Sequence, residues 1–235
     1  MKISTKILIG LALFLFGSLF ASNLILKNAY DNRDRKDRFA NYNTVLQQPF
    51  KHIKIAKSAL LGRISIQKGA KSEVKISKAI PNFKFDSSQM YVANDTLFMS
   101  FAVAEINYAY NDCIICILLP EISSIEGLNA TFVLGAFDQK TLEVKLSDDA
   151  HLTIENDFGD LETLKLSLSG ATLSFNEGLR ADKSKIHSVK TVEANLQNYS
   201  KLDLGRVDVQ ALKLNASDNS TVELSGRTLQ GFMKK

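Results

Sequence analysis

The sequence predicts an all-β chain, in which a β-helix (a solenoid of short repeated strands) follows one N-terminal transmembrane helix. Three observations support this fold class: an uncharged apolar run near the N-terminus, alternating apolar residues in most of the remainder, and a phrase that recurs four times. The expected organisation is a membrane anchor at 1–27, a charged juxtamembrane stalk at 28–49 and a β-helical domain at 50–235. The clearest repeats lie at 125–226.

The apolar run ILIGLALFLFGSLFASNLIL occupies residues 7–26, between Lys6 and Lys27. A helix of that length rises about 30 Å at about 1.5 Å per residue, which matches the hydrocarbon thickness of a bilayer. The competing interpretation is a cleaved signal peptide, which needs small residues at positions −3 and −1 of the cut. A cut after Ala21 would leave Leu19 at −3. We therefore expect an uncleaved signal-anchor that binds the lipid bilayer through residues 7–26.

The orientation of this helix follows less directly from the sequence. Two lysines precede the helix and five Lys or Arg residues follow it by position 38, which places the domain inside the cell by the positive-inside rule. Long domains, however, translocate largely regardless of nearby charge. Together with the resemblance described below, this favours a single-pass protein of the cytoplasmic (inner) membrane, with its β domain on the extracytoplasmic side.

The net charge of +4 comes wholly from residues 1–38, which carry seven Lys or Arg and three Asp. The remainder is neutral, with 22 basic and 22 acidic residues. A nucleic-acid binder needs a concentrated positive surface that replaces phosphate counterions. We therefore expect no nucleic-acid partner.

Charge is nevertheless uneven within the neutral part. Residues 39–85 carry nine basic residues and one Glu, whereas residues 86–160 carry thirteen acidic residues and two Lys. One interpretation is two solvated faces that neutralise each other. The other is a basic layer that lies against anionic lipid headgroups. The candidate membrane-surface contacts of that layer are Lys51, Lys54, Lys57, Lys71 and Lys75.

Residues after Pro49 alternate between apolar and polar, the period of a half-buried strand. The segments HIKIAK, GRISIQ and SEVKIS show this pattern. The runs DTLFMSFAV and CIICILLP are densely apolar but too short to span a membrane, so we expect strands that are buried on both faces.

Four segments from Leu142 to Leu224 share one plan: three alternating apolar positions, a small polar turn, and two more apolar positions. They read LEVKLSDDAHLTI, LKLSLSGATLSF, VEANLQNYSKLDL and LKLNASDNSTVEL, and a fainter copy covers residues 125–134. Repeats of about twenty residues are typical of solenoids, because one copy cannot bury its own apolar stripe. The helical half and the asparagine signature of leucine-rich repeats are missing, so we expect a β-helix.

These strands resemble the putative auto-transporter adhesin head (GIN) domain family of bacterial envelope proteins. The resemblance covers about residues 50–227 and is carried by CIICILLPEISSIEGLNATFVL and LSLSGATLSF. It implies an extracytoplasmic, right-handed β-helical domain, and the family's adhesin label implies surface binding. The anchor departs from the pattern, since a cleaved export signal would be expected there.

Cys113 and Cys116 form a CxxC motif within an apolar strand-like run. Redox-active CxxC motifs lie at helix starts, where the thiolate is stabilised. Residues three apart on a regular strand point to opposite faces, which disfavours a disulfide between them. We therefore expect buried structural thiols.

The remaining chemistry-bearing residues do not form an established catalytic or metal motif. His52, His151 and His187 are isolated, no zinc-ligand spacing surrounds them, and no glycine-rich phosphate loop occurs. We expect no catalytic residue, cofactor or metal. Asp148, Asp149, Asp157 and Asp160 form an acidic stretch that is a candidate surface for a glycan or a protein partner.

Two functions of different class remain open. The first is a non-catalytic, membrane-anchored envelope module that binds an unknown protein or glycan through the exposed side of the solenoid, in the manner of an adhesin. The second is a carbohydrate-active β-helix enzyme that uses carboxylates near 148–160, since general acid–base catalysis needs two nearby carboxylates of different pKa. Asp148 and Asp149 fall at a repeat turn, where aspartate is a common turn former, and this favours the non-enzymatic interpretation.

Overall fold

The structure, a computed structural model, describes residues 3–31, 38–56, 63–78, 89–100, 113–135, 137–155, 161–176, 188–205, 207–224 and 228–230. The chain divides into two compact units, Met1–Asn41 and Tyr42–Lys235. Lys57, Asp157, Asp160 and His187, named above from the sequence, lie outside the described residues.

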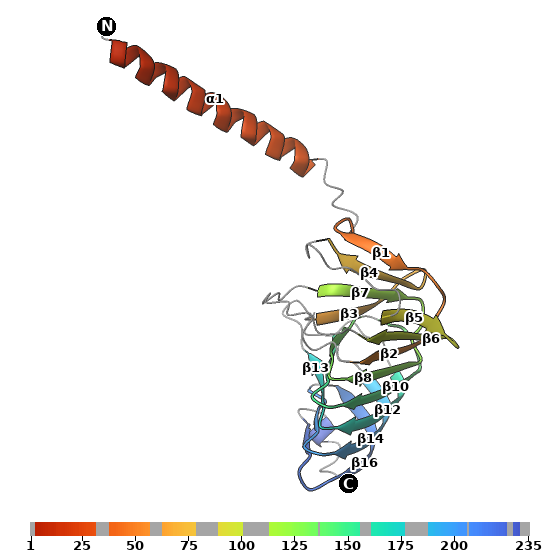
Figure 1. The fold of residues 1–235 in the computed structure, drawn as a ribbon. Helices are drawn as coiled ribbons and strands as arrows, with labels where there is room; N and C mark the ends of the chain where they lie inside the picture. Colours follow the sequence, from red (N-terminus) through yellow and green to blue (C-terminus); the bar gives the residue numbers. More distant parts are fainter. Residues whose placement is uncertain are drawn as a thin grey trace. The chain divides into compact units, whose positions relative to one another are not determined.

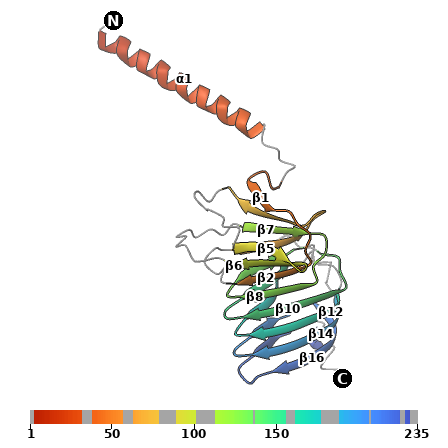
Figure 2. The ribbon, with the colours of Figure 1, turned by 45° about the vertical axis from the view of Figure 1, so that its right-hand side comes forward.

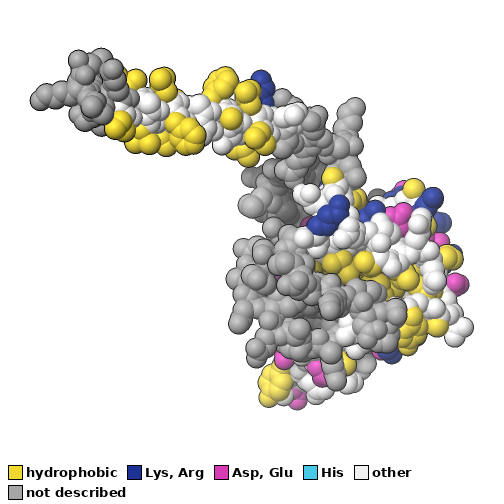
Figure 3. All heavy atoms as spheres, turned by 45° about the horizontal axis from the view of Figure 1, so that its top comes forward, with side chains coloured by type: hydrophobic (Ala, Val, Ile, Leu, Met, Phe, Trp, Pro, Cys, Tyr) yellow, Lys and Arg dark blue, Asp and Glu magenta, His cyan; other side chains and the backbone are white. Residues whose placement is uncertain are grey.

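The first unit is the α-helix α1 (Ile3–Asp31). Its segment Ile9–Asn28 has a mean hydropathy of 2.1 and none of it is buried within the protein. Apolar side chains cover much of its visible surface in Figure 3. The helix is therefore long and apolar enough to span a membrane.

The described residues of the second unit form seventeen strands in two open sheets (Figures 1 and 2). Sheet A has the order β1-β4-β7-β3-β9-β11-β13-β15-β17, and sheet B the order β16-β14-β12-β10-β8-β2-β6-β5. The strands of sheet A are β1 (Tyr42–Leu46), β3 (Arg63–Lys68), β4 (Glu73–Ser77), β7 (Cys113–Leu119), β9 (Thr131–Leu134), β11 (His151–Glu155), β13 (Thr172–Asn176), β15 (Lys201–Asp203) and β17 (Thr221–Glu223). Those of sheet B are β2 (His52–Ala56), β5 (Met90–Ala93), β6 (Thr96–Ser100), β8 (Ser124–Leu128), β10 (Thr141–Ser147), β12 (Leu161–Ser169), β14 (Ser188–Gln197) and β16 (Asp208–Ala216).

From β8 onward the chain alternates strictly between the two sheets, and each strand pairs in parallel with the equivalent strand of the next copy. Figure 2 shows β8, β10, β12, β14 and β16 as successive arrows of one direction. Antiparallel pairing occurs only at one end of the described strands, where β1 pairs with β4, β4 with β7, and β5 with β6. Each copy of the repeated sequence therefore contributes one strand to sheet A and one strand to sheet B.

The register expected for the repeats is confirmed. Val144 pairs with Leu166, Leu166 with Ala194, and Ala194 with Leu214. On the other side of the turn, Leu152 pairs with Leu173 and Leu173 with Leu202. The fainter copy also follows this register, because Phe132 pairs with Leu152.

Equivalent apolar residues of successive copies pair with one another along each sheet and form columns. These apolar columns form the core between the sheets. Val144, Leu166 and Ala194 are each at most 5% exposed, whereas the charged residues between them point outward. The faint copy has Gly127 where the next copy has Leu146, and a Cβ at Gly127 would meet the Phe132 ring. The ring of Phe132 therefore occupies the space that a larger residue at position 127 would need.

Leu214 was expected in the interior but is 44% exposed, so that expectation is wrong for the last copy. Its strand β16 is the edge of sheet B, and no described strand pairs with its outer side. An apolar residue of the repeat is buried by the copies on both sides of it, and among the described residues the last copy has one neighbouring copy.

Strand β1 lies in the part of the chain that was expected to form a stalk. It pairs antiparallel with β4, and the Tyr42 hydroxyl donates to the Cys113 carbonyl oxygen at 2.7 Å. Residues 42–46 thus extend sheet A beyond β4.

The expectation that Cys113 and Cys116 point to opposite faces is also wrong. Their sulfur atoms lie 3.5 Å apart. The register of β3 against β7 shifts here, because Arg63 pairs with Cys113 but Ile64 pairs with Ile115. Ile114 is therefore one extra residue in β7, and such a bulge restores the two cysteines to the same side of the strand.

The parallel register predicts a sharp contrast between two neighbouring positions of β12. Leu166→Asp buries an unpaired carboxylate between two copies, so the free energy of unfolding should fall by several kcal/mol. Ser167→Asp adds the same carboxylate at an exposed site paired with Lys145, and should stay within about 0.5 kcal/mol of wild type. Urea denaturation monitored by circular dichroism measures both values. Equal losses of stability in the two variants would contradict the register.

Candidate binding site at the corner turns

In the first three copies of the repeat, the corner turn that carries the chain from sheet B to sheet A has a left-handed backbone conformation. Asp148 and Asp149 have φ angles of 51° and 61°, and the Ala150 amide donates to the Ser147 carbonyl at 3.2 Å. Aspartate and asparagine tolerate this conformation better than most residues, because their short side chains hydrogen-bond the local backbone. Turn formation therefore accounts for both aspartates.

The other copies build the same corner with different residues. The shorter second copy uses Gly170, with φ 61°, and the third uses Asn198 and Tyr199, with φ 53° and 62°. In the fourth copy the Ser220 amide donates to the Ser217 carbonyl at 2.9 Å across Asp218 and Asn219. The left-handed turn is thus shared by the first three copies with different side chains, whereas the fourth copy keeps the hydrogen bond without a positive φ at Asp218 or Asn219.

Backbone hydrogen bonds connect the successive corners. The Asp149 amide donates to the Gly170 carbonyl at 2.8 Å, and the Gly170 amide donates to the Gln197 carbonyl at 3.1 Å. The Asn198 side-chain amide also donates to the Ser169 hydroxyl at 2.9 Å. These contacts fix the spacing of the side chains that project from the corners.

A cavity of about 330 Å³ lies along three successive corners. Its lining is largely polar and comes from the first, second and third copies of the repeat: Asp149, Ala150, His151, Gly170, Ala171, Thr172, Asn198 and Tyr199. The small residues of the second copy leave this space, and the longer turns on either side form its walls. We refer to these eight residues as the corner cavity.

Tyr199 is the most unusual residue of the corner cavity. Its side chain is 78% exposed, and a bulky residue with a positive φ is a backbone outlier. Strained backbone of this kind is concentrated at functional sites. Sequence reasoning missed Tyr199, although a signal was present: an aromatic residue stands at the turn position that Asp149 and Asn219 occupy in other copies.

His151 also lines the corner cavity and is half-buried. Burial lowers the pKa of His151 below its ordinary value of 6.5, and the positive charge of Arg63 lowers it further. The neutral imidazole, which can both donate and accept one hydrogen bond, is therefore the favoured form at neutral pH.

Of the acidic residues singled out from the sequence, Asp149 lines the corner cavity and Asp148 precedes it in the same turn. Among the described residues that line the cavity, Asp149 is the single carboxylate. Within the described part of the chain, no group of three or more His, Cys, Asp and Glu side chains is placed to hold a metal ion.

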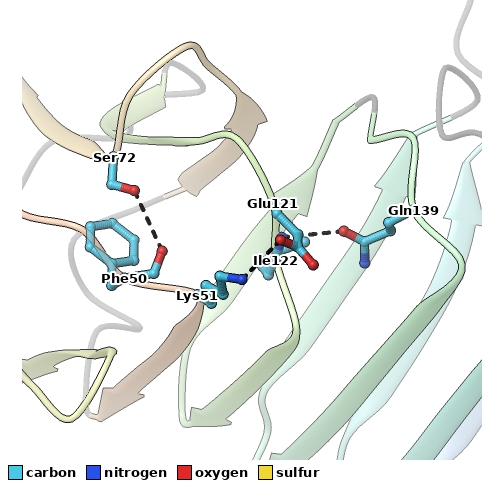
Figure 4. A network of polar contacts seen from close by, with 6 residues as sticks. All are labelled: Phe50, Lys51, Ser72, Glu121, Ile122 and Gln139. Carbon is cyan, nitrogen blue, oxygen red and sulfur yellow. Dashed lines mark hydrogen bonds and ion pairs between the residues drawn. The ribbon is translucent and has the colours of Figure 1, made fainter.

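The described candidate membrane-surface lysines do not line the corner cavity, and three of them are ion-paired. Lys51 contacts Glu121 at 3.1 Å (Figure 4), Lys54 contacts Glu126 at 2.6 Å, and Lys75 contacts Glu73 at 3.0 Å. Lys71 is exposed. Figure 3 likewise shows basic and acidic side chains interspersed on the face in view. Lys51, Lys54 and Lys75 thus neutralise neighbouring glutamates.

The pairing at Lys51 belongs to a short polar network between β2 and β8. Figure 4 shows the Ile122 amide donating to the Gln139 side-chain oxygen at 3.3 Å, and the Ser72 hydroxyl donating to the Phe50 carbonyl at 3.4 Å. These two hydrogen bonds satisfy backbone groups near the strand ends.

Comparison with known proteins gives structural similarity without a family assignment. No family model matches the chain, and no curated protein matches it. A crystal structure of a "putative adhesin" from Parabacteroides merdae has a TM-score of 0.48 at 11% identity, over 77% of this chain and 79% of that one. Structures with the same description from Parabacteroides distasonis and Bacteroides fragilis have TM-scores of 0.45 and 0.40 at 12% and 11% identity. They cover 77% of this chain, and 79% and 95% of their own.

The lowered pKa of His151 predicts a pH-dependent stability. The unfolded chain protonates this histidine as pH falls through about 6.5, whereas the folded chain resists protonation. The contribution of neutral His151 to the free energy of unfolding is therefore fully present above pH 6.5. It is lost as the pH falls towards the pKa of His151 in the folded chain. Thermal unfolding at pH 7.5 and pH 5.5 measures the loss, and His151→Gln should reduce it. An unchanged loss in the variant would assign it to other groups.

Proposed function

We propose that this chain is a non-catalytic envelope module, anchored in a membrane by α1, that binds a glycan at the corner cavity in an adhesin-like manner. We further propose that the second unit is a right-handed β-solenoid, in which each copy contributes one strand to each sheet. The observation that carries the proposal is the exposed, backbone-strained Tyr199 at the edge of a largely polar cavity.

The chemistry of the corner cavity suits a sugar. A pyranose presents apolar C–H groups that pack on an aromatic ring, and Tyr199 offers such a ring at low conformational cost. The hydroxyl groups of the sugar require both donors and acceptors, which Asp149, Asn198 and His151 supply. A volume of about 330 Å³ lies at the lower end of the range for ligand sites.

The rigidity of the stacked corners supports binding rather than catalysis. Side chains on hydrogen-bonded turns are held before the ligand arrives, which reduces the entropy lost on association. A glycosidase of the usual kind needs two carboxylates on opposite sides of the scissile bond. The described lining of the corner cavity supplies Asp149 alone, so no observation favours the enzyme.

We propose that α1 remains uncleaved in the cytoplasmic membrane and that the second unit lies on the extracytoplasmic side. The length and hydropathy of the helix support the anchor. The outward orientation goes together with the proposed glycan binding, because extracellular and envelope polysaccharides are accessible there.

Glycan binding is tested with the full-length protein in detergent on an array of bacterial and host polysaccharides. Tyr199→Asn should abolish binding at this site, because it removes the ring. It should also raise the free energy of unfolding by about 1 kcal/mol, since asparagine tolerates the left-handed backbone. Tyr199→Phe keeps the ring and should retain most of the affinity.

Three outcomes would contradict the proposal. Wild-type protein that binds no arrayed glycan would remove the glycan function, and capture of a protein instead would change the class of partner. Equal glycan binding by wild type and Tyr199→Asn would move the site away from the corner cavity.

Topology is tested independently of ligand binding. A phosphatase reporter fused after Lys235 should be active only outside the cytoplasmic membrane, and the fusion should resist extraction by alkaline carbonate. Release of a soluble product with a new N-terminus near Asn23 would instead identify α1 as a cleaved signal peptide. Reporter activity inside the cell would reverse the proposed orientation.

A further inference from the structure

The two cysteines of β7 form a close pair in the interior strands of sheet A, away from the corner cavity. The bulge at Ile114 places both on one face of the strand, with the Cys113 and Cys116 sulfur atoms 3.5 Å apart. A disulfide bond is about 2.0 Å long, so the sulfur atoms must approach by about 1.5 Å to form one. A regular strand with the same CxxC sequence would not offer this geometry.

The two sulfur atoms differ in their surroundings. Cys116 is 3% exposed, whereas Cys113 is partly accessible at the beginning of β7. The neighbouring strand contributes Ser65, which pairs with Cys116 and is itself 5% exposed. A reagent from solution can therefore meet Cys113 first, and the buried Cys116 sulfur lies 3.5 Å from that of Cys113.

Hydrogen bonds favour the thiolate of Cys113. The thiol of Cys116 lowers the pKa of Cys113 most, burial opposes it, and groups of Ser65 and Tyr42 lower it further, to about 7. The Ile115 carbonyl lies 3.0 Å from the Cys113 sulfur and accepts a hydrogen bond from the protonated form. The net direction is downward, so a substantial fraction of thiolate is present near neutral pH.

We propose that Cys113 and Cys116 are a redox-active dithiol that forms an intrachain disulfide by exchange with a low-molecular-weight disulfide. This activity goes beyond the proposed binding function and does not depend on it. The described residues near the pair include no third ligand for a metal ion, which distinguishes this pair from a metal-bound CxxC.

The reaction has two balanced steps. The Cys113 thiolate attacks one sulfur of the disulfide reagent, which forms a mixed disulfide and releases one thiolate. Cys116 loses its proton and attacks the Cys113 sulfur, which closes the Cys113–Cys116 bond and releases the second thiolate. In total the protein dithiol is oxidised by two electrons, the reagent is reduced to two thiols, and the two protein protons end on those thiols.

The test uses the full-length protein in detergent, reduced and freed of reductant, with oxidised glutathione as the probe. After quenching and alkylation with N-ethylmaleimide, the peptide that contains both cysteines should have lost two hydrogen atoms and carry no maleimide. Two equivalents of reduced glutathione should be released. The rate of the first step should rise with pH around 7, rather than around the ordinary thiol value of 9.0.

Matched serine variants assign the two roles. Cys116→Ser should accumulate a stable glutathione adduct on Cys113, whereas Cys113→Ser should react at least about tenfold more slowly, because the accessible thiolate is gone. Circular dichroism must show that both variants are folded. The proposal is overturned if the folded wild-type protein keeps both thiols open to maleimide, stops at the mixed disulfide, or forms disulfides only between chains.

Discussion

The parallel pairing of equivalent apolar residues is the interaction on which the rest of the second unit depends. Val144, Leu166 and Ala194 are buried because each lies between a residue of the preceding copy and one of the next. Burial of a large aliphatic side chain contributes about 1.5–3 kcal/mol, and each copy repeats that contribution in several columns. Each copy is therefore stabilised by its contacts with the adjacent copies. Leu214 in the last described copy remains exposed because a described copy lies on one side of it only.

The same register assigns stability and the proposed binding to different residues. The buried apolar columns stabilise the fold, and the corner residues form the proposed binding site. Once the apolar columns fix the stacking, the corner residues need only tolerate a left-handed backbone, a requirement that aspartate, asparagine and glycine meet in different copies. The corners are therefore free to differ in side chain. Tyr199 departs from the tolerant residues at a cost of backbone strain, and the small Gly170 beside it leaves the space of the corner cavity.

Alternating apolar residues predicted most of the strands and the register of the repeats, and a densely apolar run predicted the buried character of β7, whereas β1 was not predicted. The features that escaped prediction depend on single irregularities. The extra residue Ile114 places Cys113 and Cys116 on the same side of the strand, where a regular strand would place them on opposite sides. The alternation of apolar residues alone cannot reveal this bulge. The corner cavity likewise requires three turns to stack, so that Asp149 was found as part of an acidic stretch while Tyr199 was overlooked.

Distances along one outward column measure the stacking most directly. Lys145, Ser167, Asn195 and Asn215 occupy equivalent positions on four successive strands. In a Cys113→Ser, Cys116→Ser background, nitroxide labels at position 145 and at each of the other three positions would be compared by electron paramagnetic resonance. Parallel, in-register stacking predicts separations that grow by about 5 Å for each strand, with scatter from the label linkers. Separations that do not increase in this order would show that the copies do not stack in register, and would contradict the account.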